Sequence, residues 1–171
     1  MIQLAKQAGA KVVATVGSDD KAAIARSLGA DVTINYKEQN VISSLQTLTA
    51  KGGIDLWFET LRTPSPETMI PMMNRRGRMI VMAGRDAQPM LPVGPLYVND
   101  LRVVGFAMFN ATAQEQRNAA VAINTAAAAG KYRAIIGQQF NLDEAAAAHR
   151  LQEDNTISGA GTLTGMIVVQ I

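Results

Sequence analysis

Short apolar, β-branched runs alternate along the chain with segments of helical spacing, and this alternation constrains the fold most. The apolar runs are 11–16, 32–35, 54–59, 79–83 and 101–108, and polar residues do not alternate through them. Runs of this kind are typical of a parallel sheet that is covered on both faces. The order strand–helix–strand with short connections predicts right-handed βαβ units. The sequence therefore predicts an α/β fold with a doubly wound parallel sheet.

The helical segments carry recognisable start and stop signals. Ser18 or Asp19, Asn40 and Ser65 are residues that commonly cap a helix, and each expected helix ends near glycine. The expected helices are 19–28, 40–50, 66–76, 112–129 and 143–154. We predict further short strands over 135–140 and within 162–171, and a long loop without regular structure over 85–99, which is rich in proline.

The first residues indicate that the chain opens within a helix. Residues 2–9 have the pattern of its last turns, with Gly9 as the stop. In a doubly wound fold a strand and a glycine-rich turn come before such a helix, and no such residues precede Ile2. We therefore expect one truncated domain over 1–171 that lacks the first strand and the glycine-rich turn. A complete chain with a rearranged sheet is the alternative.

Composition excludes several kinds of site. The 171 residues contain no cysteine, which excludes disulfides, cysteine zinc ligands and a thiol nucleophile from this portion. His149 is the one histidine, which makes a Ser-His-Asp triad improbable. The 16 Lys and Arg residues nearly balance 14 Asp and Glu residues, and aromatic residues make up 5%, so nucleic-acid binding is not predicted. No apolar run is long enough to cross a membrane, and we expect a cytoplasmic protein.

The end of the run 11–16 is where such folds select their nucleotide. An acidic residue at this position bonds the ribose 2′-hydroxyl of NAD, but Gly17 and Ser18 are neutral. A helix start, Lys21 and the hydroxyl of Tyr36 are expected at the same sheet edge, and together they suit a phosphate. This interpretation predicts a 2′-phosphate pocket that selects NADPH. The alternative is a capped helix with a solvated lysine and an edge tyrosine.

Several motifs resemble the medium-chain dehydrogenase/reductase superfamily, and within it the zinc-independent quinone oxidoreductases related to zeta-crystallin. The motifs are 6–15, Gly17-Ser18 with Lys21, 28–31, 34–36, 53–55, 77–81, 145–151 and 161–169. The resemblance covers essentially all 171 residues but only the second part of such an enzyme. It implies a Rossmann-like nucleotide-binding domain. It also implies that 162–171 is a C-terminal strand that would pack on an absent catalytic domain.

The resemblance implies roles by position. Gly17, Ser18, Lys21 and Tyr36 match the side of the site that holds the adenosine 2′-phosphate. The residues that match the remainder of the cofactor site are Thr63, Met82, Ala83, Gly84, Val104, Gly105 and Phe106. Plain core packing is the alternative for Met82, Ala83 and Phe106. No catalytic residue and no metal ligand is assigned in this chain.

The implied activity is that of an NADPH-dependent oxidoreductase, with hydride transfer to a small quinone or enone. One alternative is an enoyl reductase module of a fatty-acid or polyketide system. Another is a truncated chain that dimerises without catalysis. The segment 101–108 resembles the edge strand through which such enzymes pair, so we expect a homodimer through it.

Overall fold

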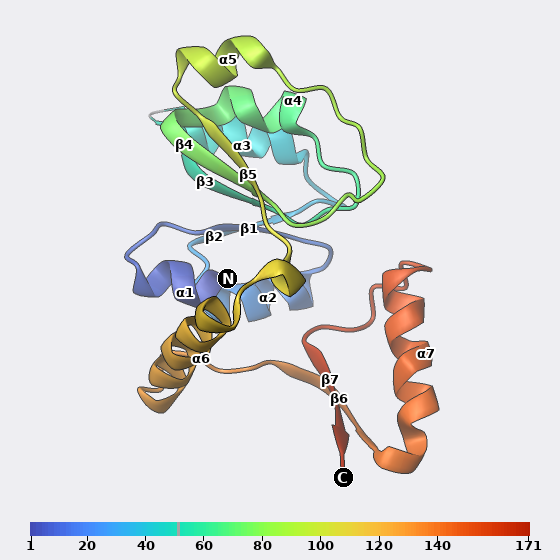
Figure 1. The fold of residues 1–171 in the computed structure, drawn as a ribbon. Coiled ribbons are helices and arrows are strands. Elements are labelled where there is room, and N and C mark those ends of the chain that lie inside the picture. The colour runs from blue at the N-terminus through green and yellow to red at the C-terminus, as the bar shows by residue number, and fades with distance from the viewer. Residues whose placement is uncertain (51) are drawn as a thin grey trace. The chain divides into compact units, whose positions relative to one another are not determined.

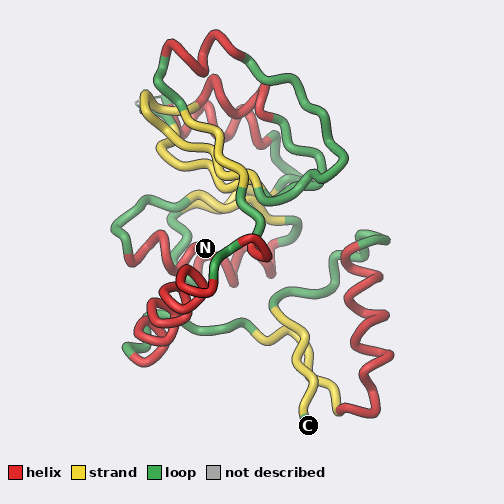
Figure 2. Tube along the Cα trace, viewed as in Figure 1, coloured by secondary structure: helices red, strands yellow, loops and turns green. Residues whose placement is uncertain are grey.

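The computed structural model describes residues 1–50 and 52–171, which form two compact units (Figure 1). The first unit contains residues 1–38 and 117–171, and the second contains residues 39–116. Both units combine helices with strands (Figure 2), and every strand pair in the described residues is parallel. The predicted α/β class with parallel pairing is therefore confirmed.

The first unit begins with a βαβ arrangement. After α1 (Ile2–Gln7), β1 (Val13–Val16) and β2 (Val32–Asn35) pair in parallel and are joined by α2 (Asp19–Ser27). Ala22 and Ala25 of α2 are buried. These small side chains let the helix approach the two strands it packs on closely.

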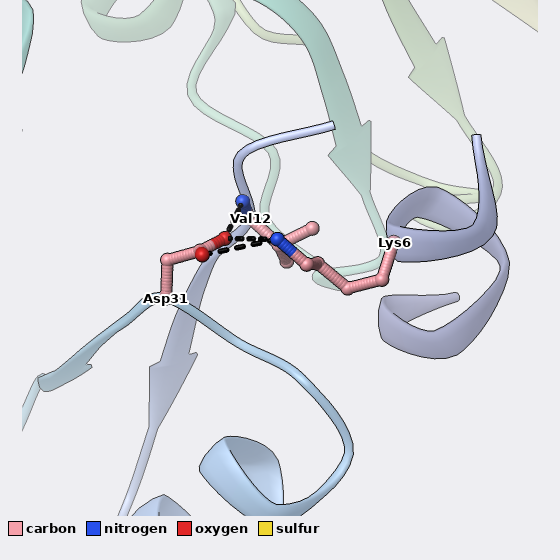
Figure 3. Close-up of polar contacts among 3 residues, drawn as sticks. All are labelled: Lys6, Val12 and Asp31. Atoms are coloured by element: carbon pink, nitrogen blue, oxygen red, sulfur yellow. Dashed lines mark hydrogen bonds and ion pairs between the residues drawn. The ribbon is translucent and has the colours of Figure 1, made fainter. Parts of the chain in front are cut away.

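An exposed carboxylate joins α1 to the start of this βαβ arrangement (Figure 3). Lys6 Nζ lies 3.0 and 2.9 Å from the two carboxylate oxygens of Asp31, and the backbone N–H of Val12 donates to the same carboxylate at 2.7 Å. The bond from Val12, followed by the contact with Lys6, lowers the pKa of Asp31 below its ordinary value. Asp31 also donates its backbone N–H to the Val12 carbonyl at 2.9 Å. The contact thus fixes where the two strands begin to pair.

The remainder of the first unit has a second parallel pair. It follows α6 (Ala113–Ala128), whose first turn belongs to the other unit, and consists of β6 (Ile136–Asn141) and β7 (Met166–Gln170). A 3-10 turn, η3 (Leu142–Glu144), and α7 (Ala145–Thr156) connect the two strands, and α7 packs on both. These elements match the sequence prediction to within a few residues.

The second unit is a three-stranded parallel sheet in the order β3–β4–β5. Its elements are α3 (Val41–Thr49), β3 (Ile54–Glu59), α4 (Pro66–Met69), η1 (Ile70–Met72), β4 (Met73–Val81), α5 (Val93–Val98), β5 (Arg102–Gly105) and η2 (Met108–Asn110). Its core is a buried cluster of Ile70, Met73 and Met79, and Trp57, Val81 and Leu101 pack against it. The helices α3, α4 and α5 lie beside the sheet in Figure 1.

The predicted helix over 66–76 is wrong in its second half. The helical turns end at Met72, and Met73–Val81 is strand β4. Met73 pairs with Ile54, and the side chain of Asn74 accepts from and donates to the backbone of Gly53. Pairing with β3 therefore outweighs the local helical spacing of the methionines.

The predicted loop over 85–99 and the predicted strand over 101–108 are also corrected. The loop contains helix α5, in which Pro95 lies in the first turn, where a missing N–H costs no helical bond. The strand is shorter, since β5 ends at Gly105. All four β5 residues are exposed, so the prediction of strands covered on both faces is wrong for β5. Within the described ranges, no helix is long and apolar enough to cross a bilayer.

Candidate functional site

The first unit has a candidate site at the corner where β1 meets α2. Ser18 is the N-cap of α2, and its hydroxyl accepts from the backbone N–H of Lys21 at 3.3 Å. Tyr36 follows β2 and donates its backbone N–H to the carbonyl of Val16 at 3.0 Å. The parallel pairing of β1 with β2 therefore carries Tyr36 to the same edge as Gly17 and Ser18.

The ring of Tyr36 lies directly over Gly17. A methyl group at position 17 would lie 2.5 Å from the Tyr36 hydroxyl oxygen, a distance that side-chain carbons essentially never reach. Tyr36 is 55% exposed, so its hydroxyl remains accessible. Among the described residues, neither this hydroxyl nor the ammonium of Lys21 has a hydrogen bond or an ion pair. We call Gly17, Ser18, Lys21 and Tyr36 the first-unit corner.

A separate candidate site lies in the second unit, at the carboxyl ends of its strands. Thr63 follows β3, Met82 follows β4, and Gly105 ends β5 opposite Val81 of β4. Phe106 donates its backbone N–H to the carbonyl of Val81 at 3.0 Å. The seven predicted residues of this unit thus follow or end three neighbouring strands at one sheet edge, where parallel α/β sheets bind ligands.

A hollow of about 490 Å³ lies at this edge. Its lining residues are Arg62, Thr63, Ala83, Gly84, Arg85, Asp86 and Ala87. Of the predicted residues, Thr63, Ala83 and Gly84 line it. The other four, Met82, Val104, Gly105 and Phe106, do not.

A buried acidic residue ends β3, three residues before Arg62 on the lining of the hollow, and it was not among the predicted site residues. Glu59 is 2% exposed and accepts hydrogen bonds from Trp57 Nε1 at 3.1 Å and from the backbone N–H of Leu61 at 2.7 Å. The available signal was an acidic residue at the end of an apolar strand. Arg62 and Arg85 were also missed, since nothing in their spacing distinguishes them from solvated charges.

Residues 1–50 and 52–171 contain no group of three or more histidine or acidic side chains that could hold an ion. His149, to which no role is assigned, is exposed on α7. The roles of the predicted cofactor residues stay predictions.

Comparison with known proteins gives consistent relatives. Residues 1–125 match the model of a zinc-binding dehydrogenase family. The human quinone oxidoreductase is 26% identical over 98% of this chain and 49% of its own length. The quinone oxidoreductase 1 of Escherichia coli is 26% identical over 94% of this chain and 51% of its own length. The chain thus spans about half the length of these curated relatives.

Solved structures share the fold. An NAD-dependent alcohol dehydrogenase matches 99% of this chain and 46% of its own chain, with a TM-score of 0.77 and 30% identity. A 2-haloacrylate reductase matches 98% of this chain and 52% of its own chain, with a TM-score of 0.79 and 26% identity. The E. coli quinone oxidoreductase solved with NADPH matches 99% of this chain and 52% of its own chain, with a TM-score of 0.77 and 23% identity. The chain therefore belongs to the zinc-binding dehydrogenase family of the medium-chain dehydrogenase/reductase superfamily, as a quinone-oxidoreductase-like domain with a Rossmann-like fold.

Proposed function

We propose that this chain is the NADPH-binding portion of an oxidoreductase that transfers hydride to a small quinone or enone. Curated relatives named quinone oxidoreductase, and a solved structure of one with NADPH, support this proposal. Relatives in the family also include an NAD-dependent enzyme. The choice between the two nucleotides therefore depends on this chain's own residues.

The observation that carries the proposal is that the first-unit corner has neutral residues, Gly17 and Ser18, where β1 ends. No carboxylate stands at Gly17 or Ser18 to bond a ribose 2′-hydroxyl and repel a phosphate. The corner instead offers the accessible hydroxyl of Tyr36, the ammonium of Lys21 and the start of α2, whose dipole favours an anion. These groups fit the 2′-phosphate that distinguishes NADPH from NADH. Asp19 and Asp20, in the first turn of α2, reduce the net positive charge there but also suit the dipole.

The second unit would orient the reactive end of the cofactor. Bound NADPH supplies the hydride, and the protein supplies position and exclusion of water. Thr63, Ala83 and Gly84 line the hollow, so their backbone and small side chains can approach a planar ring closely. Val104 and Phe106 are exposed apolar groups at the same strand ends. We assign no proton-transfer residue in this chain.

The first-unit corner can be tested with small probes that need only that corner. We expect adenosine 2′-phosphate to bind more tightly than adenosine 5′-phosphate in calorimetric titrations, and NADPH more tightly than NADH. Lys21→Ala should weaken NADPH binding by about 10- to 150-fold, because a charge-assisted bond contributes roughly 1.5–3 kcal/mol. NADH binding should not change.

A matched control is Lys11→Ala, which removes an exposed lysine before β1, at the opposite end of the strand. It should leave both affinities unchanged. Equal affinity of the unmodified chain for the two adenosine phosphates would remove the proposed nucleotide preference.

A further inference from the structure

The buried carboxylate of Glu59 has no part in the function proposed so far. It ends strand β3 and is 2% exposed, yet both of its oxygens have a donor. Oε2 accepts from the indole Nε1 of Trp57 at 3.1 Å, and Oε1 accepts from the backbone N–H of Leu61 at 2.7 Å. One donor lies within β3, and the other lies in the loop that leaves it.

The same residue also holds the neighbouring strand end. The carbonyl of Glu59 accepts the backbone N–H of Met82 at 3.0 Å, just after β4. Glu59 therefore bonds Leu61, the second residue after β3, with its side chain, and Met82, the first residue after β4, with its main chain. The residues that follow them, Arg62 and Thr63 after β3 and 83–87 after β4, line the hollow.

These two lining segments meet closely. A side chain at Gly84, which has a φ of +87°, would lie 2.8 Å from Pro64 Cδ and 3.2 Å from the carbonyl oxygen of Arg62. Arg62 and Thr63 of one segment line the hollow together with Gly84 of the other. A shift of the loop after Leu61 would therefore change the shape of the hollow.

A carboxylate is a costly group to bury for packing alone. An apolar residue of similar volume would fill the space without losing hydration. A buried carboxylate gives short, directional bonds to N–H groups, and the 2.7 Å contact with Leu61 has the length of such a charge-assisted bond. These hydrogen bonds offset part of the cost of burying the carboxylate. They also hold the loop in one geometry.

We propose that Glu59 is a positioning residue, which holds Leu61 so that Arg62 and Thr63 keep a fixed place against the segment at Gly84. This preorganises the sheet edge that faces the cofactor before the cofactor binds. The effect on NADPH rests on the proposed function. The effect on the loop does not.

The test replaces the carboxylate by an amide of the same shape. Glu59→Gln has one acceptor oxygen where the carboxylate has two, and that oxygen carries no charge. The bond to Leu61 is therefore either lost or changed from a charge-assisted bond to a weaker neutral one. We expect faster hydrogen exchange at the Leu61 amide, a shift in the emission of Trp57, which is the chain's single tryptophan, and about tenfold weaker NADPH binding. Far-UV circular dichroism should stay unchanged.

Trp57→Phe is the matched variant, because it removes the indole donor and leaves the bond to Leu61. Protection of the Leu61 amide and NADPH affinity should both be retained. A loss of affinity equal to that of Glu59→Gln would overturn the proposal, since Glu59 would then act through the strand and not through the loop.

The remaining outcomes separate this proposal from the proposed function. If the unmodified chain binds no NADPH, the proposed function fails, while exchange at Leu61 still tests the positioning. Unchanged exchange at Leu61 in Glu59→Gln overturns the positioning role whatever the chain binds. Loss of the folded far-UV signal in that variant also overturns it, because the carboxylate would then support the whole unit. Unchanged NADPH affinity despite faster exchange shows that the loop does not position the cofactor.

Discussion

Single residues decide what the first-unit corner can bind. Gly17 leaves space for the ring of Tyr36, and that ring presents its hydroxyl beside the start of α2. A larger residue at position 17 would push the ring away from this place. The missing side chain at Gly17 is therefore needed for Tyr36 to lie where it could contact a phosphate.

Tyr36→Phe removes only the hydroxyl and keeps the ring over Gly17. We expect NADPH affinity to fall about 10- to 150-fold and NADH affinity to stay constant, because a hydrogen bond to a charged group contributes roughly 1.5–3 kcal/mol. Fluorescence titration of the reduced nucleotides measures both values. Tyr97→Phe, which changes another exposed tyrosine on α5 of the other unit, serves as the control. An equal loss for NADH would show that the ring, and not a phosphate contact, matters.

Asp31 makes stability depend on pH in a defined direction. Its pKa is lowered in the folded chain, chiefly by the Val12 N–H, so the unfolded chain binds a proton more readily. The contribution of Asp31 is therefore present above its unfolded pKa and is lost as the pH falls, between about pH 5 and pH 2. Urea unfolding should show Asp31→Asn to be less stable than the unmodified chain at pH 7, with the difference shrinking towards pH 2.

A second carboxylate acts in the same direction and needs to be separated from Asp31. The backbone N–H of Thr112, followed by its hydroxyl, lowers the pKa of Glu115. The unmodified chain therefore contains both contributions, and only the difference from Asp31→Asn reports on Asp31. A difference that stays constant with pH would contradict the assigned cause.

At the level of elements, helix caps differ in what they contribute. The side chain of Asn40 accepts from the backbone N–H of Ser43 at 3.0 Å at the start of α3, whereas Ser65 makes no such bond at the start of α4. Asn40→Ala should therefore lower the free energy of unfolding by about 1 kcal/mol, and Ser65→Ala by clearly less. Urea unfolding of the two variants compares them directly. Equal losses would show that cap identity, and not the observed bond, sets the stability.

Local signals predicted the elements whose ends are set locally. The helix over 19–28 is found as α2 with Ser18 as its cap, and Gly29 follows it with a φ of +104°. The strand over 54–59 is found with the same bounds as β3. These residues carry their structural preference within a few positions of the chain.

Prediction failed where residues distant in the sequence determine the local structure or the burial of a side chain. Residues 73–76 have a helical pattern, but Met73 pairs with Ile54 of β3, and these residues form the start of strand β4. The site shows the same division. That Gly17, Ser18 and Tyr36 share one edge could be predicted, because strand ends meet there in a parallel sheet. Glu59 could not be found, because its burial depends on Trp57 and on a loop that folds back over it.

At the scale of the whole molecule, exposed apolar groups concentrate after α5. Val103, Val104, Phe106, Met108 and Phe109 are between 40% and 77% exposed, and they follow one another closely in the chain. Contiguous exposed apolar surface commonly marks an interface. Within the described residues, β5 pairs only with β4, so its other edge has unpaired backbone groups.

The homodimer through 101–108 stays a proposal, which this surface supports, since a second copy would cover the same groups in a two-fold arrangement. Val103→Lys would place a charge in the interface, and edge lysines oppose strand association. We expect the dimer dissociation constant of Val103→Lys to be at least about tenfold higher than that of the unmodified chain. Analytical ultracentrifugation measures both constants. Val121→Lys is the matched control, because Val121 is a 65% exposed valine on α6, outside this segment. An unmodified chain that sediments as a monomer at all concentrations, or an equal effect of the two lysines, would contradict dimerisation through β5.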